Sequence, residues 1–410
     1  MSIFGGKISP NRCGAIIDVG SGSVLIAIVY SNPTEDHPQI IWSHREHAPL
    51  RNIDSLERSA KAVMTALVNS SILLDTNGRK ALREFNSSLK ISELQCSISA
   101  PWSYTITKTI NYTQTSDFLI TEELLKELTN TVELKIQSEL KENESLQDLG
   151  LKVITKTNMS LTANGYHIKE PLNNSAKNLT VSQGSAVSQH HLIEALDEVH
   201  DKLLPNTSNR KISFILMLYS LTREMFNQLY DVCLLDITYE ATEIGIVRDG
   251  VLSYCTHIPF GSFSLAREIS EITKIPLHEA FANLHTENPY QFLDNLSAKQ
   301  KQEVETMFEN YTNELAQLFH ETGDNLSIPR TISVHSDLSS EPIFIDIIKK
   351  AAKRAVKTDV NVTSITSEII KKMYAKQTED TDRKIPRDTA LLLSAQFFHN
   401  QQQHQLYKHF

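Results

Sequence analysis

A short segment near the start of the chain has residue types that could bind a phosphate. Asp18 ends an apolar run and is followed by Gly20, Ser21, Gly22 and Ser23. Glycines allow an anion to approach backbone N–H groups, because they lack a Cβ atom and tolerate positive φ. The serine hydroxyls could donate to phosphate oxygens, and the acid could bind a metal ion or its water. On this segment alone, an ordinary Gly-Ser hairpin is an equally good interpretation.

The same pattern occurs a second time in the chain. The apolar run Val232–Leu235 leads into Asp236, as an apolar run leads into Asp18. In each copy an apolar return strand follows the turn, at Val24–Tyr30 and at Ile244–Val247, and a third strand comes after it. A three-strand meander whose first turn follows an Asp therefore appears twice. Such a repeat predicts two pseudo-symmetric α/β lobes that face a cleft.

A different pattern separates the two copies, over residues 86–204. Alternating residue types over 105–112 predict a strand, and Thr121 is a predicted N-cap for a helix. Asn164-Gly165 predicts a tight hairpin turn, and the apolar spacing over 189–204 predicts a helix. These elements form a predicted small α+β module. Beyond it, the apolar pattern predicts strands at 212–218 and 331–335 and helices at 222–229, 276–285, 297–322, 342–356 and 389–399.

The composition argues against several classes of protein. With 49 acidic and 40 basic side chains, the net charge is -9, which is not the electrostatic footprint of a nucleic-acid-binding protein. The four cysteines are far apart and lie beside apolar residues, which predicts buried free thiols in a reducing compartment. No apolar run approaches ~18 residues, so no membrane-spanning helix is expected. The chain length predicts roughly two to three domains.

Several segments resemble the actin-like ATPase fold, shared by actin, sugar kinases and heat-shock chaperones, and in particular its bacterial FtsA/PilM branch. IIDVGSGSV is similar to the phosphate-1 motif of these proteins, and LLDITYEATEIGIVRDGVLSYCTHIPFG is similar to their phosphate-2 segment. The module between the copies, with its ISAPW and ITEELL segments, resembles the small domain that FtsA and PilM insert in the first lobe. PRDTALLLSAQFF resembles their closing helix. The resemblance covers nearly the whole chain, and the order of these segments along the sequence is its strongest support.

The resemblance implies an α/β fold with two pseudo-symmetric actin-like (ribonuclease H-like) lobes around a cleft. The expected parts are a first lobe over 1–85, an inserted small α+β domain over 86–210, a second lobe over 211–385, and a closing helix with a polar tail over 386–410. ATP with Mg²⁺ is the implied cofactor, with Asp18 holding the metal through a water. The implied phosphate-binding residues are Asp18, Gly20, Ser21, Gly22, Ser23, Asp236, Thr242 and Glu243.

The second hairpin departs from the family pattern. Where the family has three glycines, this chain has Thr238, Tyr239 and Glu240, and Ala241 replaces the first threonine. The Tyr side chain would fill the phosphate space unless it points away. A Glu carboxylate repels a phosphate by ~4 kcal/mol at about 4 Å and an effective dielectric near ~20. In the adenosine region, Val334–Asp337 replaces a glycine run. These departures favour weak or lost nucleotide binding, with ATP binding and little hydrolysis as the alternative.

The expected function is that of a bacterial cytoskeletal or scaffold protein, an adaptor at the inner face of the membrane in cell division or type IV pilus assembly. The implied partners are a tubulin-like division protein or a pilus membrane protein, and self-association is a further option. The expected location is the cytoplasm or the periphery of the inner membrane. The alternative is a functional ATPase or small-molecule kinase of the same fold, for which Glu243 is the one candidate acid. No other catalytic residue is assigned.

Overall fold

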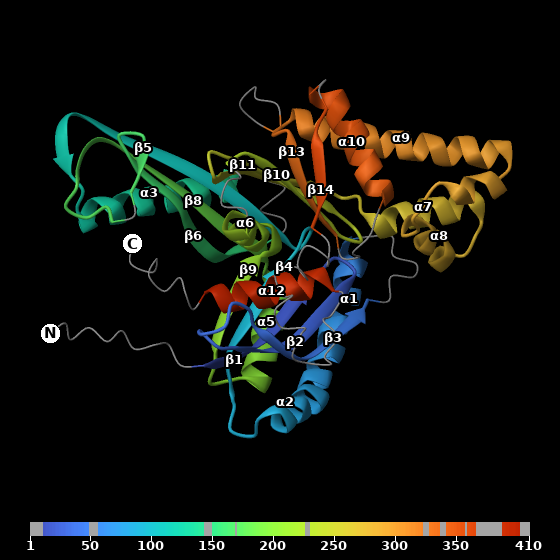
Figure 1. The fold of residues 1–410 in the computed structure, drawn as a ribbon, viewed down its shortest axis with the longest axis horizontal. Coiled ribbons are helices and arrows are strands. Elements are labelled where there is room, and N and C mark those ends of the chain that lie inside the picture. The colour runs from blue at the N-terminus through green and yellow to red at the C-terminus, as the bar shows by residue number, and fades with distance from the viewer. Residues whose placement is uncertain are drawn as a thin grey trace. The chain divides into compact units, whose positions relative to one another are not determined.

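The computed structural model describes residues 11–48, 56–142, 150–168, 170–225, 230–322, 328–336, 342–356, 359–365 and 388–401. The chain forms two compact units, each assembled from separate stretches of sequence (Figure 1). Unit 1 contains residues 1–97, 191–212 and 390–410. Unit 2 contains residues 98–190 and 213–389.

Unit 1 is built on a five-stranded sheet with the order β3-β2-β1-β4-β9. The strands are β1 (Arg12–Val19), β2 (Ser23–Ser31), β3 (Gln39–His47), β4 (Ile91–Ile98) and β9 (Ser208–Ser213). The helices are α1 (Leu56–Leu73), the π-helical turn η1 (Leu74–Gly78), α2 (Arg79–Phe85), α5 (His190–Leu203) and α12 (Thr389–Asn400). β1, β2 and β3 form the predicted antiparallel meander. β1 and β2 are buried almost throughout, which explains their uninterrupted apolar runs.

Helix α12 packs on β1 and β2, far from them in sequence. Phe398 of α12 shares a buried core cluster with Ile16 and Leu25. The helix approaches β1 so closely that a Cβ atom added at Gly14 would lie 2.4 Å from the Phe398 ring. Arg12 donates to the Phe398 carbonyl, and its guanidinium lies 4.2 Å from the centre of that ring. The predicted closing helix is therefore confirmed from Thr389 onward, while its first two residues lie outside the described residues.

Unit 2 contains a second five-stranded sheet with the order β12-β11-β10-β13-β14. The strands are β10 (Val232–Ile237), β11 (Thr242–Arg248), β12 (Val251–Ile258), β13 (Thr331–Ser336) and β14 (Asn361–Ser364). The helices are α6 (Phe214–Met225), α7 (Ser262–Thr273), α8 (Leu277–Leu284), the 3₁₀ helix η2 (Gln291–Asn295), α9 (Ala298–His320) and α10 (Pro342–Val356). β10, β11 and β12 form an antiparallel meander, and β13 runs parallel to β10. The predicted repeat of the meander is thus confirmed.

The remainder of unit 2 is an α+β module. Its strands form an antiparallel sheet with the order β5-β8-β6-β7. They are β5 (Ser103–Leu119), β6 (Leu151–Ala163), β7 (Tyr166–His167) and β8 (Ser175–Gln189). Helix α3 (Glu122–Glu142) buries Leu125, Leu128, Val132 and Ile136. Asn164 and Gly165 have φ angles of 51° and 84°, as a tight hairpin turn requires.

Two sequence predictions differ from this arrangement. The predicted inserted domain, 86–210, includes β4 and most of β9, but these strands lie in the unit 1 sheet. Sheet membership depends on distant strands, so the local pattern could not show it. The predicted strand at 212–218 is wrong, because α6 begins at Phe214. A continuous apolar run suits a fully buried helix as well as a buried strand, and this run is buried throughout.

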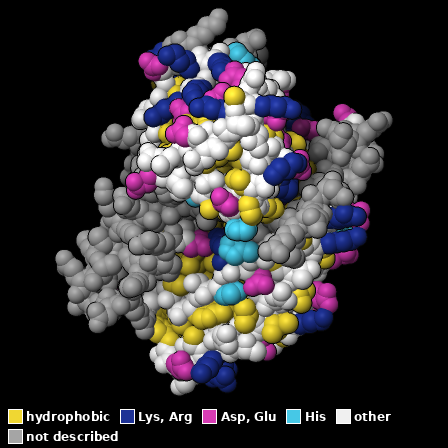
Figure 2. All heavy atoms as spheres, turned by 90° about the vertical axis from the view of Figure 1, so that its right-hand side faces the viewer, with side chains coloured by type: hydrophobic (Ala, Val, Ile, Leu, Met, Phe, Trp, Pro, Cys, Tyr) yellow, Lys and Arg dark blue, Asp and Glu magenta, His cyan; other side chains and the backbone are white. Residues whose placement is uncertain are grey.

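Three general features of the described residues bear on function. No described helix has the length and apolar character needed to cross a membrane. On the face in Figure 2, Lys and Arg side chains lie among Asp and Glu side chains. Arg354 of α10, for example, pairs with Glu309 of α9 at 2.7 Å. The four cysteines are free thiols, and burial raises the pKa of both Cys13 and Cys96 to about 12.

Candidate functional site

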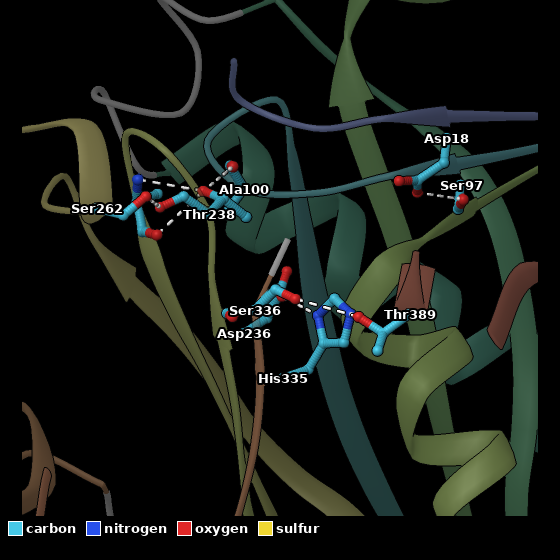
Figure 3. A network of polar contacts seen from close by, with 10 residues as sticks. Asp18, Ser97, Ala100, Asp236, Thr238, Ser262, His335, Ser336 and Thr389 are labelled. Atoms are coloured by element: carbon cyan, nitrogen blue, oxygen red, sulfur yellow. Dashed lines mark hydrogen bonds and ion pairs between the residues drawn. The ribbon is translucent and has the colours of Figure 1, made fainter. Parts of the chain in front are cut away.

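The first hairpin, in unit 1, brings the predicted phosphate-1 residues together in one buried turn. Asp18, at the end of β1, is 1% exposed. Its Oδ1 accepts a 2.6 Å hydrogen bond from the Ser97 hydroxyl of β4 (Figure 3). The N–H of Gly20 donates to the Ser23 carbonyl and closes the turn. No local sequence pattern indicates Ser97, because its contact with Asp18 depends on β1 and β4 being neighbours in the sheet.

A basic side chain from β3 completes this hairpin. The guanidinium of Arg45 donates a 2.6 Å hydrogen bond to the Ser23 hydroxyl, which is fully buried. The Gly22 carbonyl accepts from the N–H of Ala48 at 2.9 Å. Arg45 places a positive charge at the turn, and sequence reasoning missed it because the β2–β3 register decides its position. The first hairpin therefore keeps features that suit an anion.

The turn of the second hairpin, in unit 2, is bonded to the first turn of α7. The N–H groups of Ser262, Phe263 and Ser264 donate to the carbonyls of Thr238 and Tyr239 at 2.9–3.2 Å. A helix N-terminus attracts anions through such N–H groups when they lack partners. Here carbonyls of the hairpin already bind three of them.

The Tyr239 side chain points into the core of unit 2. It is 4% exposed, and its ring contacts Phe281 of α8 edge-on with the ring centres 5.4 Å apart. A second ring, that of Phe263, lies 6.1 Å away. The sequence predicts that Tyr239 fills the phosphate space unless its side chain points away. In the structure it does point away and packs among other aromatic rings.

Glu240 is paired with an arginine. Both of its carboxylate oxygens accept 2.6 Å hydrogen bonds from Arg267 of α7, and Ser264 donates a third at 3.1 Å. The hydrogen bonds with Glu240 are the largest cause of the pKa of Arg267 being raised above its ordinary value. Glu240 is therefore not the unpaired carboxylate that the predicted repulsion of a phosphate requires. The two side chains instead fasten the hairpin turn to α7.

Thr242 is bonded within the core of unit 2. Its hydroxyl donates to the Phe260 carbonyl at 2.7 Å and lies 2.8 Å from the hydroxyl of Tyr311 in α9. Because the single Thr242 proton goes to the carbonyl, Tyr311 is the donor in the second bond. The predicted phosphate contact of Thr242 would require both bonds to break.

Four ionisable side chains form a row across the second sheet, which we call the acid–histidine row. It consists of His257 (β12), Glu243 (β11), Asp236 (β10) and His335 (β13), and each residue is paired in register with the next. His335 Nδ1 lies 2.7 Å from Asp236 Oδ1, and His335 Nε2 lies 3.1 Å from the Thr389 hydroxyl (Figure 3). The sequence predicts a role for the two acids, whereas His335 belongs to the segment that departs from the adenosine motif. Asp337 lies outside the described residues.

Burial shifts the titration of this row. It raises the pKa of Glu243 well above the usual value, and the neighbouring Asp236 raises it further. Burial also lowers the pKa of His257 to about 4. Among the described residues, Glu243 Oε2 and Asp236 Oδ2 have no hydrogen-bond partner, although both acids are buried. In the described part of the chain, no group of three His, Cys, Asp or Glu residues could hold a metal ion.

The second hairpin does not fit a magnesium nucleotide as the resemblance implied. Thr242, the α7 N–H groups and one oxygen of Asp236 all bind partners within unit 2. The first hairpin retains its acid, glycines and serines, with Arg45 beside them. The two hairpins, similar in strand pattern, therefore differ in what they offer a phosphate.

Comparison with known proteins supports the fold. No protein-family model matches the sequence, and no curated protein is similar to it. A solved structure of the PilM–PilN type IV pilus biogenesis complex matches with a TM-score of 0.55 and 12% identity, over 95% of this chain and 98% of that chain. The ethanolamine utilization protein EutJ of Carboxydothermus hydrogenoformans matches with a TM-score of 0.42 and 10% identity, over 96% of this chain and 91% of that chain. The predicted actin-like α/β fold is confirmed, and at this identity the comparison shows the fold alone.

Proposed function

We propose that this chain is a non-catalytic adaptor of the actin-like fold, with weak or no affinity for nucleotide. One observation carries the proposal: the groups of the second hairpin that would meet a phosphate are bonded inside unit 2. Each such bond contributes about 0.5–1.5 kcal/mol, and leaving a buried group unpaired costs about 1–3 kcal/mol. A nucleotide would have to offset several of these losses at once.

The proposed partner is a protein at the inner face of a bacterial membrane. The similar solved structure is of PilM in complex with PilN, a pilus biogenesis pair, and the match spans 98% of that chain. This supports a role in type IV pilus assembly, with a tubulin-like division protein as the other proposed partner. Self-association is part of the same proposal. A pull-down with the purified chain as bait, probed for both partner types, separates the two roles.

A functional ATP-binding protein is the second candidate, and the first hairpin favours it. Asp18 is held at 2.6 Å by Ser97, and Arg45 adds a positive charge at the turn. These features suit a bound phosphate even where the second hairpin does not. Hydrolysis would still need an acid, and Glu243 is buried and tends to hold its proton.

Isothermal titration of the purified chain with Mg-ATP tests the proposal. We expect no binding in the micromolar range. A thermal melt adds a check, because a ligand at 100 times its Kd stabilises the folded state by about 2.7 kcal/mol. Asp18→Ala is the matched variant. Micromolar binding of Mg-ATP that disappears in Asp18→Ala would contradict the proposal of an adaptor with weak or no nucleotide affinity. It would favour the ATP-binding alternative.

A further inference from the structure

The hydrogen bonds around His335 have a fixed direction. The hydroxyl of Thr389 donates its only proton to the Ser336 carbonyl at 3.2 Å, since a carbonyl can only accept (Figure 3). The same hydroxyl lies 3.1 Å from His335 Nε2, so it can only accept there. This assignment of the Thr389 proton places a proton on His335 Nε2.

The other ring nitrogen faces an acid. His335 Nδ1 lies 2.7 Å from Asp236 Oδ1, and both side chains are buried. If Asp236 is ionised, Nδ1 also donates, and the ring then carries protons on both nitrogens. The ring of Phe214 lies 4.8 Å from the imidazole, measured between ring centres, with the two planes tilted by 38°. A buried carboxylate without a compensating charge would be costly.

We propose that His335 is held as an imidazolium whose positive charge permanently compensates Asp236 inside unit 2. The imidazolium of His335 then balances the negative charge of Asp236 within the second hairpin. Asp236 therefore does not require a bound metal ion to compensate its charge. This inference rests on the proposed function, because a bound magnesium nucleotide would be a competing source of positive charge.

Glu243 fits the same charge balance. It is paired directly with Asp236 across β10 and β11, and each acid has one oxygen without a hydrogen-bond partner in the part of the chain that the structure describes. In the proposed state Glu243 is neutral, and the Asp236–His335 pair contains one negative and one positive charge. His257, at the far end of the row, is neutral at physiological pH because its pKa is about 4.

Nitrogen NMR of the full-length chain with ¹⁵N-labelled histidine tests the proposal directly. Between pH 7 and 8, both ring nitrogens of His335 should have shifts of protonated nitrogen. His285 and His257 are internal controls, since burial lowers the pKa of each to about 4, and each should show one unprotonated nitrogen. An unprotonated nitrogen on His335 in this range would overturn the proposal.

The His335 signal is assigned from its loss in His335→Gln. If that variant does not fold, Thr389→Val removes the acceptor of Nε2–H and shifts the same signal. Manganese titration without nucleotide adds a second readout. We expect wild type and Asp236→Asn to give the same Mn²⁺ titration, because Asp236 binds no metal ion. A Mn²⁺ site that is present in wild type and absent in Asp236→Asn would overturn the inference. ATP titration tests the proposed function separately: ATP binding with a doubly protonated His335 rejects that function and leaves the charge assignment intact.

Discussion

Glu243 and Glu240 lie three residues apart, yet the groups that surround them differ. Glu240 accepts two hydrogen bonds from Arg267. Glu243 is 2% exposed and faces Asp236, and burial is the larger cause of its raised pKa. The folded chain therefore holds a proton on Glu243 that the unfolded chain releases above its ordinary pKa of 4.5. This contribution to stability is complete below that pH and is lost as the pH rises through the raised pKa.

Glu243→Gln should remove this pH dependence. Glutamine is the neutral analogue of the protonated acid, and its amide can still accept from the backbone of Ala100, a bond that Glu243 makes. We expect a gain of about 1–3 kcal/mol in the free energy of unfolding at pH 7, growing by up to about 1.4 kcal/mol per pH unit relative to pH 5. Urea unfolding from pH 5 to 8 measures it, with exposed Glu127→Gln as control. Equal pH slopes in wild type and Glu243→Gln would contradict a protonated Glu243.

At the scale of elements, the junction between the β10–β11 turn and α7 decides what the second hairpin can bind. The turn supplies carbonyls to the helix N-terminus, and Glu240 with Arg267 holds the two together. Close approach requires a glycine, since a Cβ atom added at Gly261 would lie 2.2 Å from the Thr238 carbonyl oxygen. Gly261 has φ of -143°, so the requirement comes from contact and not from backbone strain.

Gly261→Ala should separate the turn from α7. We expect a loss of about 3 kcal/mol or more in the free energy of unfolding, because backbone atoms cannot move as a side chain can. Gly184→Ala is the matched control, since its nearest neighbour is the flexible Met159 side chain at 3.3 Å. That variant should lose less than about 1 kcal/mol. Chemical denaturation measures both, and equal losses would argue against the tight junction.

At the scale of the molecule, residues from opposite ends of the chain build one core. α12 covers β1 and β2 in unit 1, and Gly14 is in direct contact with the Phe398 ring. Unit 1 is therefore assembled from three separate stretches of sequence. Its stability depends on the C-terminal stretch as much as on the first strands.

Gly14→Ala should force the Phe398 ring away from β1 and destabilise the chain by about 1–3 kcal/mol. Phe398→Leu, which shortens the ring side chain, should be less harmful in the Gly14→Ala background than in wild type. A double-mutant cycle by thermal or urea unfolding should give a favourable coupling of about 0.5–3 kcal/mol. Additive losses would show that the two residues are not in contact.

The local sequence determined features that depend on neighbouring residues. The two meanders, the turn at Asn164-Gly165 and the helix at 342–356 follow from apolar periodicity and turn chemistry, and the structure has them. The fold followed from the order of the motifs. Asp18 and its turn were also identified together, because they are consecutive.

Only the tertiary structure decided which groups meet across strands and helices. Ser97 on Asp18, Tyr311 on Thr242 and His335 on Asp236 come from segments that are 69 to 99 residues away. Register and sheet order fix such contacts, and neither is encoded in a local pattern. For the same reason the sequence predicted an obstruction by Tyr239 and a repulsion by Glu240. In the folded chain one residue packs with aromatic rings and the other pairs with Arg267, because burial requires each to find a suitable partner.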